Sequence, residues 1–279
     1  MQTITDIKKE YFGKIDSLDL DLIISGVLKK SREFVLAHSE YVIPTLKIKN
    51  LKLKILRRMR SEPLAYILGS REFYGLNFKV TPATLIPRPE TELLVEEVLQ
   101  LHPKNKKIID IGTGSGNIIV TLAKNILTEN TFIGIDISPK ALAIAKQNAK
   151  TNAVAEKIKF IHGNLLDKVE NIDNSIIIAN LPYLSQEIYS ATLPTVKKYE
   201  PKSALFSPKK GLDHYEKLLQ QIYNLRVTSY ELHVTTLMEI SPEQKTDLQK
   251  IIKNYFPKAQ VEFKKDLTNR WRVCKVEIK

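Results

Sequence analysis

A glycine-rich segment is the first part of the sequence with the residue types to bind a ligand. Gly112, Gly114 and Gly116 alternate with other residues directly after a short apolar run that contains Asp110. Glycine lets the backbone adopt a positive φ and lets a ligand approach it closely. A turn of this kind, at the carboxyl end of the first strand, is where open α/β sheets bind ligands. A second acid, Asp136, ends the next apolar run, so the pattern predicts a ligand site with acidic acceptors.

The glycine spacing resembles motif I of the class I methyltransferases, which bind S-adenosylmethionine. A dinucleotide fingerprint is G-x-G-x-x-G, whereas this chain has G-x-G-x-G after an acid. The resemblance implies that Gly112–Gly116, with Thr113 and Ser115, binds the cofactor. It also implies that Asp136 accepts the ribose hydroxyls and that Asp110 lies near the methionine ammonium. A nicotinamide-binding turn and a purely structural turn are the alternatives.

A third segment, Phe160–Asp167, follows the next predicted strand. In class I methyltransferases this region reaches the adenine. By that resemblance, Asn164 bonds the exocyclic amine and Leu165 covers the ring. An ordinary strand end is the alternative interpretation.

The motif Asn180-Leu181-Pro182-Tyr183 follows a fourth apolar run. It resembles the Asn-Pro-Pro-Tyr motif of methyltransferases that act on planar exocyclic or amide nitrogens. An amide nitrogen is a poor nucleophile because its lone pair is delocalised into the carbonyl. The Asn180 side-chain oxygen and the Leu181 carbonyl can hold an NH₂ group with its lone pair aimed at the methyl donor.

The other two residues of this motif support the same chemistry. Pro182 stiffens the turn, and Tyr183 offers a flat wall to a planar group. We expect these four residues to be catalytic and Asn180 also to contact the cofactor. A strand-ending turn without function is the alternative.

Alternating strands and helices position these motifs. Strands are predicted at 107–111, 131–135, 157–161, 175–179 and 236–240, with two more near Val261 and Val273, and helices at 117–125, 139–148, 212–225 and 243–255. This alternation indicates an α/β fold with a mostly parallel sheet. The first 75 residues instead have helical spacing, with an apolar stripe formed by Ile48, Leu51, Ile55, Leu56 and Met59. Aromatic residues between glycines and prolines at 72–89 predict a hairpin or an extended connector, and a helix follows from Glu90 to Leu101.

Three segments of this connector resemble the HemK/PrmC family of protein-(glutamine-N5) methyltransferases. They are Glu62–Gly69, Glu72–Leu76 and Leu85–Glu92. The resemblance continues through Glu200-Pro201 and Gly211–Tyr215. It implies a small all-α domain at 1–72, a β-hairpin linker at 73–90, and a Rossmann-like class I methyltransferase domain with a seven-stranded sheet at 91–279.

The family resemblance also implies an activity. The enzyme would transfer a methyl group from S-adenosylmethionine to the glutamine of the Gly-Gly-Gln motif in class 1 peptide chain release factors, which the helical domain would recognise. Pro87–Glu92 would then lie beside the active site, or it would be a rigid linker, since prolines restrict the residues before them. The chain departs from the family pattern at Leu181, which replaces a proline, at Asn164 and Leu165, and at Ser207–Lys210.

Two other functions fit parts of the pattern. A DNA adenine-N6 or ribosomal RNA guanine-N2 methyltransferase would stack a flipped base on the aromatic residue, and the net charge of +12 suits nucleic acid. However, no extra target-recognition domain is evident. A non-catalytic module that keeps the fold is the other alternative.

Composition narrows the class of protein. The 279 residues are 43% hydrophobic and 27% charged, as in globular proteins. One cysteine excludes an intrachain disulfide and a cysteine-rich zinc site. The polar start lacks the apolar core of a signal peptide, and no apolar run would span a membrane. We therefore expect a cytoplasmic protein that needs no membrane. We also expect a monomer that does not require direct nucleic acid binding.

Seven basic residues and no acid lie between Lys47 and Arg60. A basic face attracts acidic partners through long-range fields, so this segment could dock an acidic face of the release factor. A solvated helix face is the alternative.

Overall fold

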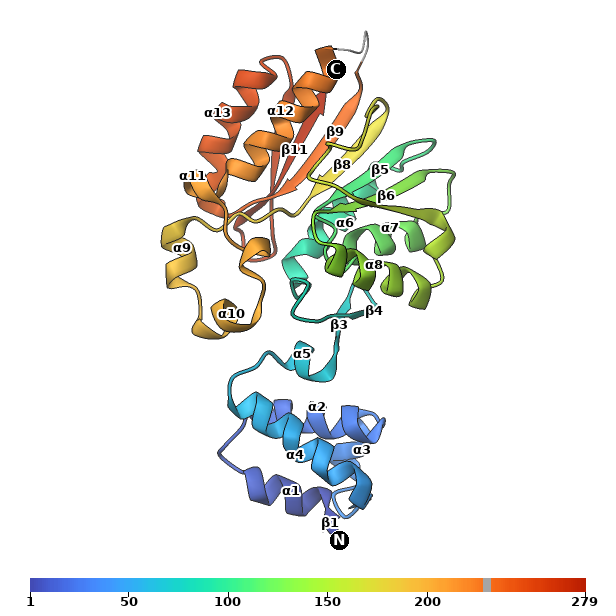
Figure 1. Ribbon diagram of the computed structural model, residues 1–279, viewed down its shortest axis with the longest axis vertical. Coiled ribbons are helices and arrows are strands. Elements are labelled where there is room, and N and C mark those ends of the chain that lie inside the picture. Colours follow the sequence, from blue (N-terminus) through green and yellow to red (C-terminus); the bar gives the residue numbers. More distant parts are fainter. Residues whose placement is uncertain (228–231) are drawn as a thin grey trace. The chain divides into compact units, whose positions relative to one another are not determined.

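The computed structural model describes residues 1–227 and 232–279, which divide into two compact units. The helical unit comprises Met1–Ser70 and Pro194–Tyr199, and the sheet unit comprises Arg71–Leu193 and Glu200–Lys279. Figure 1 shows helices in the first and a sheet covered by helices in the second. In the described residues, the helical unit has one buried apolar cluster and the sheet unit has two, and a core of its own is what lets a domain be stable by itself.

The helical unit is built mainly from α1 (Ile4–Tyr11), α2 (Ser17–Leu28), α3 (Arg32–Ala37), α4 (Thr45–Met59) and α5 (Leu64–Leu68). Side-chain oxygens of Thr3, Asp16 and Ser31 accept the free N–H groups at the starts of the first three helices. The expected helices are therefore present. The unit also contains an antiparallel pair of two-residue strands, β1 (Gln2–Thr3) and β2 (Val42–Ile43), which are too short to leave a sequence pattern.

Helix α4 differs from its predicted packing. Leu51 and Ile55 are fully buried, but Leu56 is 45% and Met59 42% exposed, so the apolar stripe is narrower than expected. Most of the basic residues of α4 make contacts within the unit: Lys47 with the Leu28 carbonyl, Lys52 with Glu10, Lys54 with the Ile67 carbonyl, Arg57 with Glu62, and Arg58 with Asp19. The segment is therefore less free to attract a partner than its composition indicates.

The sheet unit contains seven strands in the order β10-β11-β9-β8-β5-β6-β7. The strands are β5 (Lys107–Ile111), β6 (Thr131–Asp136), β7 (Ile158–His162), β8 (Ser175–Ala179), β9 (Val234–Glu239), β10 (Gln260–Lys265) and β11 (Trp271–Ile278). The five strands from β5 to β9 are parallel, and β11 pairs antiparallel with β9 and with β10. The predicted seven-stranded, mostly parallel sheet is confirmed.

Helices cover both faces of this sheet. Alternate strand residues point to opposite faces: Ile176 and Ile178 join one buried cluster, and Ile177 joins the other. The first cluster includes residues of α6 (Glu92–Gln100), α7 (Asn117–Asn125) and α8 (Pro139–Thr151), and the second includes residues of α12 (Asp213–Val227) and α13 (Lys245–Tyr255). The result is a three-layer sandwich with two cores.

The predicted hairpin is formed by β3 (Ser70–Phe73) and β4 (Leu76–Lys79). Phe73 and Phe78 are buried in the cluster that contains residues of α6 and α7. The Asn148 side chain, on α8, exchanges two hydrogen bonds with the backbone of Lys79 and donates a third to the Ser115 carbonyl. The end of the hairpin is therefore tied to the glycine-rich loop.

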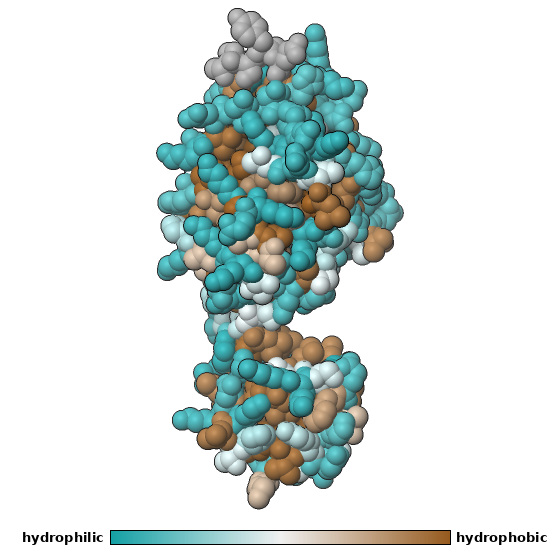
Figure 2. Space-filling model, turned by 90° about the vertical axis from the view of Figure 1, so that its right-hand side faces the viewer, coloured by the Kyte–Doolittle hydropathy of each residue, from teal (hydrophilic) through white to brown (hydrophobic). Residues whose placement is uncertain are grey.

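Several short helices were not predicted, because they have too few residues to show a period. They are η1 (Pro89–Thr91), η2 (Ala155–Lys157), α9 (Gln186–Ala191), α10 (Pro194–Tyr199), η3 (Lys202–Ala204), α11 (Pro208–Gly211) and η4 (Pro242–Gln244). Apolar side chains reach the surface of both units among polar ones (Figure 2). Within the described residues, no helix has the length and hydropathy to cross a membrane.

Candidate active site

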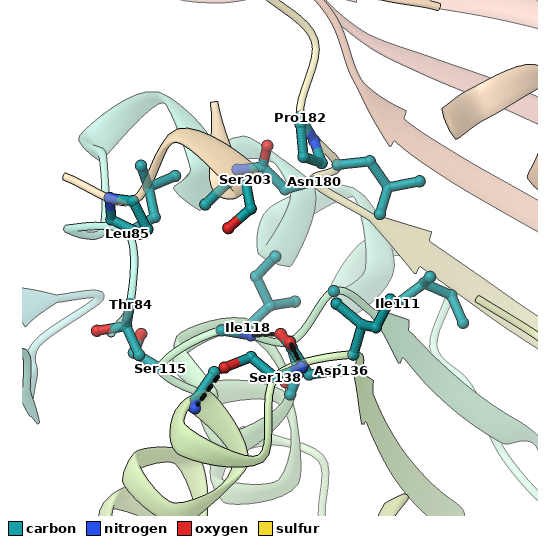
Figure 3. A pocket seen from close by; sticks show the side chains of 18 of the residues that line it. Thr84, Leu85, Ile111, Ser115, Ile118, Asp136, Ser138, Asn180, Pro182 and Ser203 are labelled. Atoms are coloured by element: carbon teal, nitrogen blue, oxygen red, sulfur yellow. Dashed lines mark hydrogen bonds between the residues drawn. The ribbon is translucent and has the colours of Figure 1, made fainter. Parts of the chain in front are cut away.

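A cavity of about 290 Å³, here called the pocket, lies at the carboxyl ends of β5, β6 and β8. The chain places β6 and β7 on one side of β5 and then crosses to β8 on the other side. Such a reversal of strand order leaves a crevice in which α/β sheets bind ligands. Figure 3 shows Asn180 and Pro182 on one side of the pocket and Asp136 and Ser138 on the opposite side.

Most of the residues predicted for the site meet at this pocket. Its lining includes Gly112, Thr113, Gly114, Ser115, Asp136, Asn164, Leu165, Asn180, Leu181 and Pro182. Asp110, Gly116 and Tyr183, although predicted with them, are outside the lining formed by the described residues. Each of these three instead contacts a residue that shapes the pocket or a neighbouring helix.

The glycine-rich loop needs its glycines for conformation and for space. Gly112, Gly114 and Gly116 have φ values of 71°, 56° and 78°, which disfavour residues with a Cβ. A Cβ at Gly116 would lie 3.1 Å from the Cβ of Ala145, so this glycine lets α7 start close to α8. Gly116 thus supports helix packing, while the other two glycines form the wall of the pocket.

Two buried acids hold the loop in place. The Thr113 hydroxyl donates to Asp110 at 2.6 Å, and the Gly114 N–H donates to Asp136 at 2.8 Å. Burial raises the pKa of Asp110 to about 7, and the second oxygen of this carboxyl has no hydrogen-bond partner in the described structure. Burial also raises the pKa of Asp136, although the hydrogen bonds from the Ser138 and Gly114 N–H groups act to lower it. A positively charged ligand nearby would favour the ionised form of both acids and lower their pKa values.

The loop after β7 contributes one exposed and one buried residue. Asn164 is exposed at the rim of the pocket, and its backbone N–H donates to Asp167. Leu165 is 6% exposed and adopts a φ of 56°. An apolar side chain beside an exposed amide is suited to a flat ring with a polar edge.

The amide of Asn180 is fixed by two residues from other elements. Its nitrogen donates to Glu239 at 3.0 Å and to the Thr91 hydroxyl at 3.1 Å. Glu239 ends β9 and Thr91 ends η1, so both approach Asn180 from the side of the sheet unit that carries α6. Both amide hydrogens are thereby used, which leaves the oxygen of this pocket-lining residue as its free acceptor.

The residues after Asn180 are held by their backbone. The Leu181 N–H donates to the Tyr215 hydroxyl at 3.3 Å, and this hydroxyl donates to the Glu239 carbonyl. The Gln244 side chain donates to the Tyr183 carbonyl at 2.9 Å. The Tyr183 ring packs against the core, and its hydroxyl donates to Glu239 at 3.2 Å. Tyr183 therefore supports the site from behind, whereas the sequence suggested a wall for the substrate.

The connector after β4 forms part of the pocket wall. Thr84, Leu85, Pro87 and Arg88 are all lining residues, as Figure 3 shows for the first two. The Arg88 guanidinium is paired with the buried carboxylate of Glu200. That carboxylate also accepts the Ile86 N–H at 3.2 Å. Of the two interpretations of this segment, a place beside the pocket is the one that the structure favours.

Sequence reasoning missed part of the pocket lining, and four of the missed residues bear on the chemistry of the site. Thr91 and Glu239 orient Asn180, and Ser203 and His214 line the pocket. Thr91 and His214 lie in two segments that carried the family resemblance, Leu85–Glu92 and Gly211–Tyr215. The sequence therefore pointed to these segments but did not indicate what the two residues do. Glu239 had one local sign, an acid at the end of a buried apolar run.

Comparison with known protein families matches both units. A PrmC N-terminal domain matches residues 13–69, and a methyltransferase domain matches residues 102–268. The release factor glutamine methyltransferase of Enterococcus faecalis is 35% identical over 87% of this chain and 85% of its own length. The chain belongs to the release factor glutamine methyltransferase family.

A second member of this family and one solved structure give further similarities, the structure at the level of the fold alone. The release factor glutamine methyltransferase of Dictyoglomus turgidum is 35% identical over 93% of this chain and 90% of its own length. Among solved structures, the hMettl16 catalytic domain, in complex with the MAT2A 3′UTR hairpin 6, aligns with a TM-score of 0.57. It is 16% identical and covers 82% of this chain and 81% of that chain, which shows a shared class I methyltransferase fold.

Proposed function

We propose that this protein methylates the side-chain amide nitrogen of a glutamine, with S-adenosylmethionine as methyl donor. The substrate that we propose is the Gly-Gly-Gln motif of class 1 peptide chain release factors. The observation that carries the proposal is the orientation of Asn180, whose amide oxygen is left as an acceptor in the pocket. The family of the chain supports the choice of substrate.

The pocket suits a ligand with positive charge. Asp110 has a buried oxygen without a hydrogen-bond partner in the described structure, and burial raises the pKa of both Asp110 and Asp136. A cation nearby would favour the ionised form of each acid. S-adenosylmethionine carries a sulfonium and an ammonium group, and it supplies an electrophilic methyl group when bound.

We assign the cofactor contacts as the sequence predicted them, with two changes of role. The loop Gly112–Ser115 would contact the cofactor, Asp136 would accept its ribose hydroxyls, and Asn164 and Leu165 would contact its adenine. Asn180 would also contact the cofactor, at the end where transfer occurs. Asp110 and Gly116 would act from outside the lining. Asp110 would act through the Thr113 hydroxyl and through its charge, and Gly116 by letting α7 pack on α8.

At the transfer end, Asn180 and Leu181 would hold the substrate amide. The Asn180 oxygen and the Leu181 carbonyl each accept one N–H, which directs the nitrogen lone pair along the path of transfer. As the N–C bond forms, the bond between the methyl group and the donor sulfur breaks, so that S-adenosylhomocysteine is the product. Positive charge would develop on the nitrogen, and the two oxygens would stabilise it. The charged nitrogen then loses a proton to water, so no strong base is needed. Pro182 would keep this turn rigid, and Tyr183 would orient Glu239.

The remaining parts of the proposal follow from this reaction. We propose that residues 1–72 recognise the release factor, that 73–90 link the domains, and that 91–279 perform methyl transfer. The reaction needs one copy of the chain and a free release factor, so we propose a monomer that acts in the cytoplasm.

The experiment is mass spectrometry of a purified release factor after incubation with the protein and S-adenosylmethionine. We expect one added methyl group on the Gly-Gly-Gln glutamine. The Asn180→Ala variant should still bind the cofactor and lose at least about 100-fold in turnover, since it lacks one acceptor. Cofactor binding without methylation of any release factor would contradict the proposal and turn attention to nucleic acid substrates.

A further inference from the structure

We infer that Glu239 and Thr91 are positioning residues that make the pocket accept a carboxamide NH₂ group and reject a carboxylate. They do so by deciding which end of the Asn180 amide faces the pocket. This inference rests on the proposed function and deepens it, because it explains how glutamine is distinguished from glutamate.

The argument begins with the two hydrogen bonds of the Asn180 nitrogen. The nitrogen of the Asn180 amide donates to Glu239 at 3.0 Å, which suits a carboxylate because its ionised form can only accept hydrogen bonds. The Thr91 oxygen, at 3.1 Å, takes the second hydrogen. The oxygen of Asn180 is then the end available to a ligand. If the amide were reversed, its oxygen would face the carboxylate of Glu239 and repel it.

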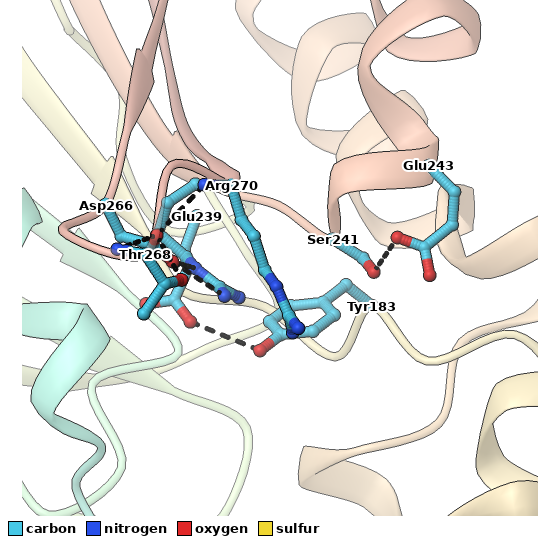
Figure 4. A network of polar contacts seen from close by, with 8 residues as sticks. Tyr183, Glu239, Ser241, Glu243, Asp266, Thr268 and Arg270 are labelled. Atoms are coloured by element: carbon cyan, nitrogen blue, oxygen red, sulfur yellow. Dashed lines mark hydrogen bonds and ion pairs between the residues drawn. The ribbon is translucent and has the colours of Figure 1, made fainter.

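Glu239 is itself held in one position. It is 1% exposed at the end of a fully buried stretch of β9. The Tyr183 hydroxyl donates to its other oxygen at 3.2 Å, as Figure 4 shows. Burial raises the pKa of Glu239, and the Thr91 and Tyr183 hydrogen bonds and the nearby Arg272 charge act against that rise. These contacts keep an acceptor behind Asn180.

This arrangement discriminates between ligands that have the same shape. A carboxamide donates N–H to the Asn180 oxygen, whereas a carboxylate places oxygen against oxygen. Discrimination of this kind is large, because an oxygen facing another oxygen in a buried site keeps no hydrogen bond. Glu239 lies outside the pocket lining and reaches the substrate only through Asn180.

The test exchanges donor and acceptor between positions 180 and 239. The variants are Asn180→Asp, Glu239→Gln and the double variant, measured for methylation of release factor, for S-adenosylmethionine affinity and for thermal stability. Asn180→Asp places two carboxylates 3.0 Å apart, so we expect turnover to fall at least about 100-fold. Glu239→Gln no longer fixes the amide, so we expect a loss of at least about 10-fold.

The double variant restores a donor–acceptor pair. The glutamine introduced at position 239 can keep its oxygen on the Tyr183 hydroxyl and donate its NH₂ to the aspartate introduced at position 180. That aspartate then presents its second oxygen to the pocket. We expect turnover at least about 10-fold above that of Asn180→Asp. Turnover no better than that of Asn180→Asp would overturn the inference, and so would a Glu239→Gln variant as active as the wild type.

A second readout measures selection directly. A release factor with glutamate in place of the Gly-Gly-Gln glutamine should inhibit the wild-type enzyme poorly. It should inhibit Glu239→Gln at least about 10-fold better relative to substrate KM, because the Asn180 NH₂ can now face the pocket. An unchanged ratio would contradict the inference. Glu243→Gln, an exposed site close by in Figure 4, is the matched control and should change neither readout.

Folding and function remain separable in this design. If Glu239→Gln does not fold, Thr91→Val replaces it, with Thr91→Ser as the variant that should retain activity through its hydroxyl. Wild-type methylation tests the proposed function, and only the variants test the inference. Failure of the wild type to methylate any release factor therefore refutes the proposed function, and with it the basis of the inference. An active wild type with unaffected variants refutes the inference alone.

Discussion

Asp110 shows most directly how the pocket is prepared for a ligand. It is 1% exposed, one of its oxygens accepts from Thr113, and the other has no hydrogen-bond partner in the described part of the chain. Placing a carboxylate there costs stability, which is acceptable beside a binding site where the charge of a cationic ligand later favours the ionised form. The raised pKa, about 7, is the measurable sign of that cost.

The first prediction concerns the pH dependence of stability without ligand. Because the folded-state pKa of Asp110 lies above its usual 3.8, the native state binds more protons between these values. The free energy of unfolding therefore falls as pH rises from about 4 to about 7. Asp110→Asn should raise that free energy by on the order of 4 kcal/mol at about pH 8 and change it little at about pH 4.

Denaturant unfolding of both proteins at several pH values measures this effect. The control is Asp247→Asn, a surface acid whose pKa is lowered by Lys210 and which should give no gain at high pH. An equal effect of Asp110→Asn at the low and the high pH would rule out a buried carboxylate with a raised pKa.

At the scale of elements, the site depends on how the hairpin, the loops and the helices are joined. Asn148, on α8, is 1% exposed and bonds to the backbone at Lys79 and Ser115. Leu184 exchanges backbone hydrogen bonds with Leu205 and Ser207, which fixes the segment after the Asn180 motif. These contacts join elements that are far apart in the sequence.

The second prediction removes the contact between hairpin and loop. Asn148→Ala leaves three backbone groups without their partners, so the free energy of unfolding should fall by about 1–3 kcal/mol. S-adenosylmethionine affinity should fall several-fold, because Ser115 lines the pocket. Asn152→Ala, one turn later and partly exposed, is the control and should cost less than half as much. Equal effects of the two variants on cofactor binding would show that this contact does not shape the loop.

The third prediction tests Gly211, at the end of α11, which lies against the Asn180 motif. Gly211 has a φ of 84°, and a Cβ there would lie 2.0 Å from the Tyr183 carbonyl oxygen. Gly211→Ala must therefore displace the motif, and turnover should fall at least about 100-fold. Gly75→Ala is the matched control, since its φ is 71° with no atom within 4 Å of a Cβ. It should cost only the strain of positive φ, about 1–2 kcal/mol. Enzyme kinetics and thermal unfolding of both variants measure these effects. A displaced motif lowers turnover, whereas backbone strain alone lowers only stability.

At the scale of the whole molecule, only some of the basic residues behind the net charge of +12 are free to contact a partner. Five of the seven basic residues between Lys47 and Arg60 contact carboxylates or carbonyls within the helical unit. Lys49 and Arg60 are exposed, and they share a helix face with Leu53 and Leu56, which are 57% and 45% exposed. This mixed basic and apolar face is the part of α4 suited to a protein partner.

The fourth prediction follows from that face. The double variant Lys49→Glu and Arg60→Glu should raise the KM for release factor at least about five-fold at low salt, and less at high salt, because ions screen exposed charges. S-adenosylmethionine affinity should not change. Arg57→Glu is the contrast: it breaks the pair with Glu62, so it should lower the stability of the helical unit. A KM that is unchanged at low salt would exclude this face as the docking surface.

Much of the molecule could be predicted from local patterns. The glycine spacing, the acids at strand ends and the Asn180 motif each lie within a few residues, and backbone conformation at that range follows from residue type. The strands of the central sheet and the long helices of the sheet unit were predicted within a few residues of their observed ends. The short helices between residues 186 and 211 were not, because four to six residues show no period.

The sequence by itself determined the fold class, the position of the cofactor loop and the identity of the transfer motif. Only the tertiary structure decided how that motif works. Asn180 is 89 residues from Thr91 and 59 from Glu239, and nothing local links them. The Tyr183 ring likewise packs against the core and its hydroxyl donates to Glu239, because a buried carboxylate needs hydrogen-bond donors. Hydrogen bonds between distant residues exist only once the sheet has brought strand ends together, and they select the group that the pocket can hold.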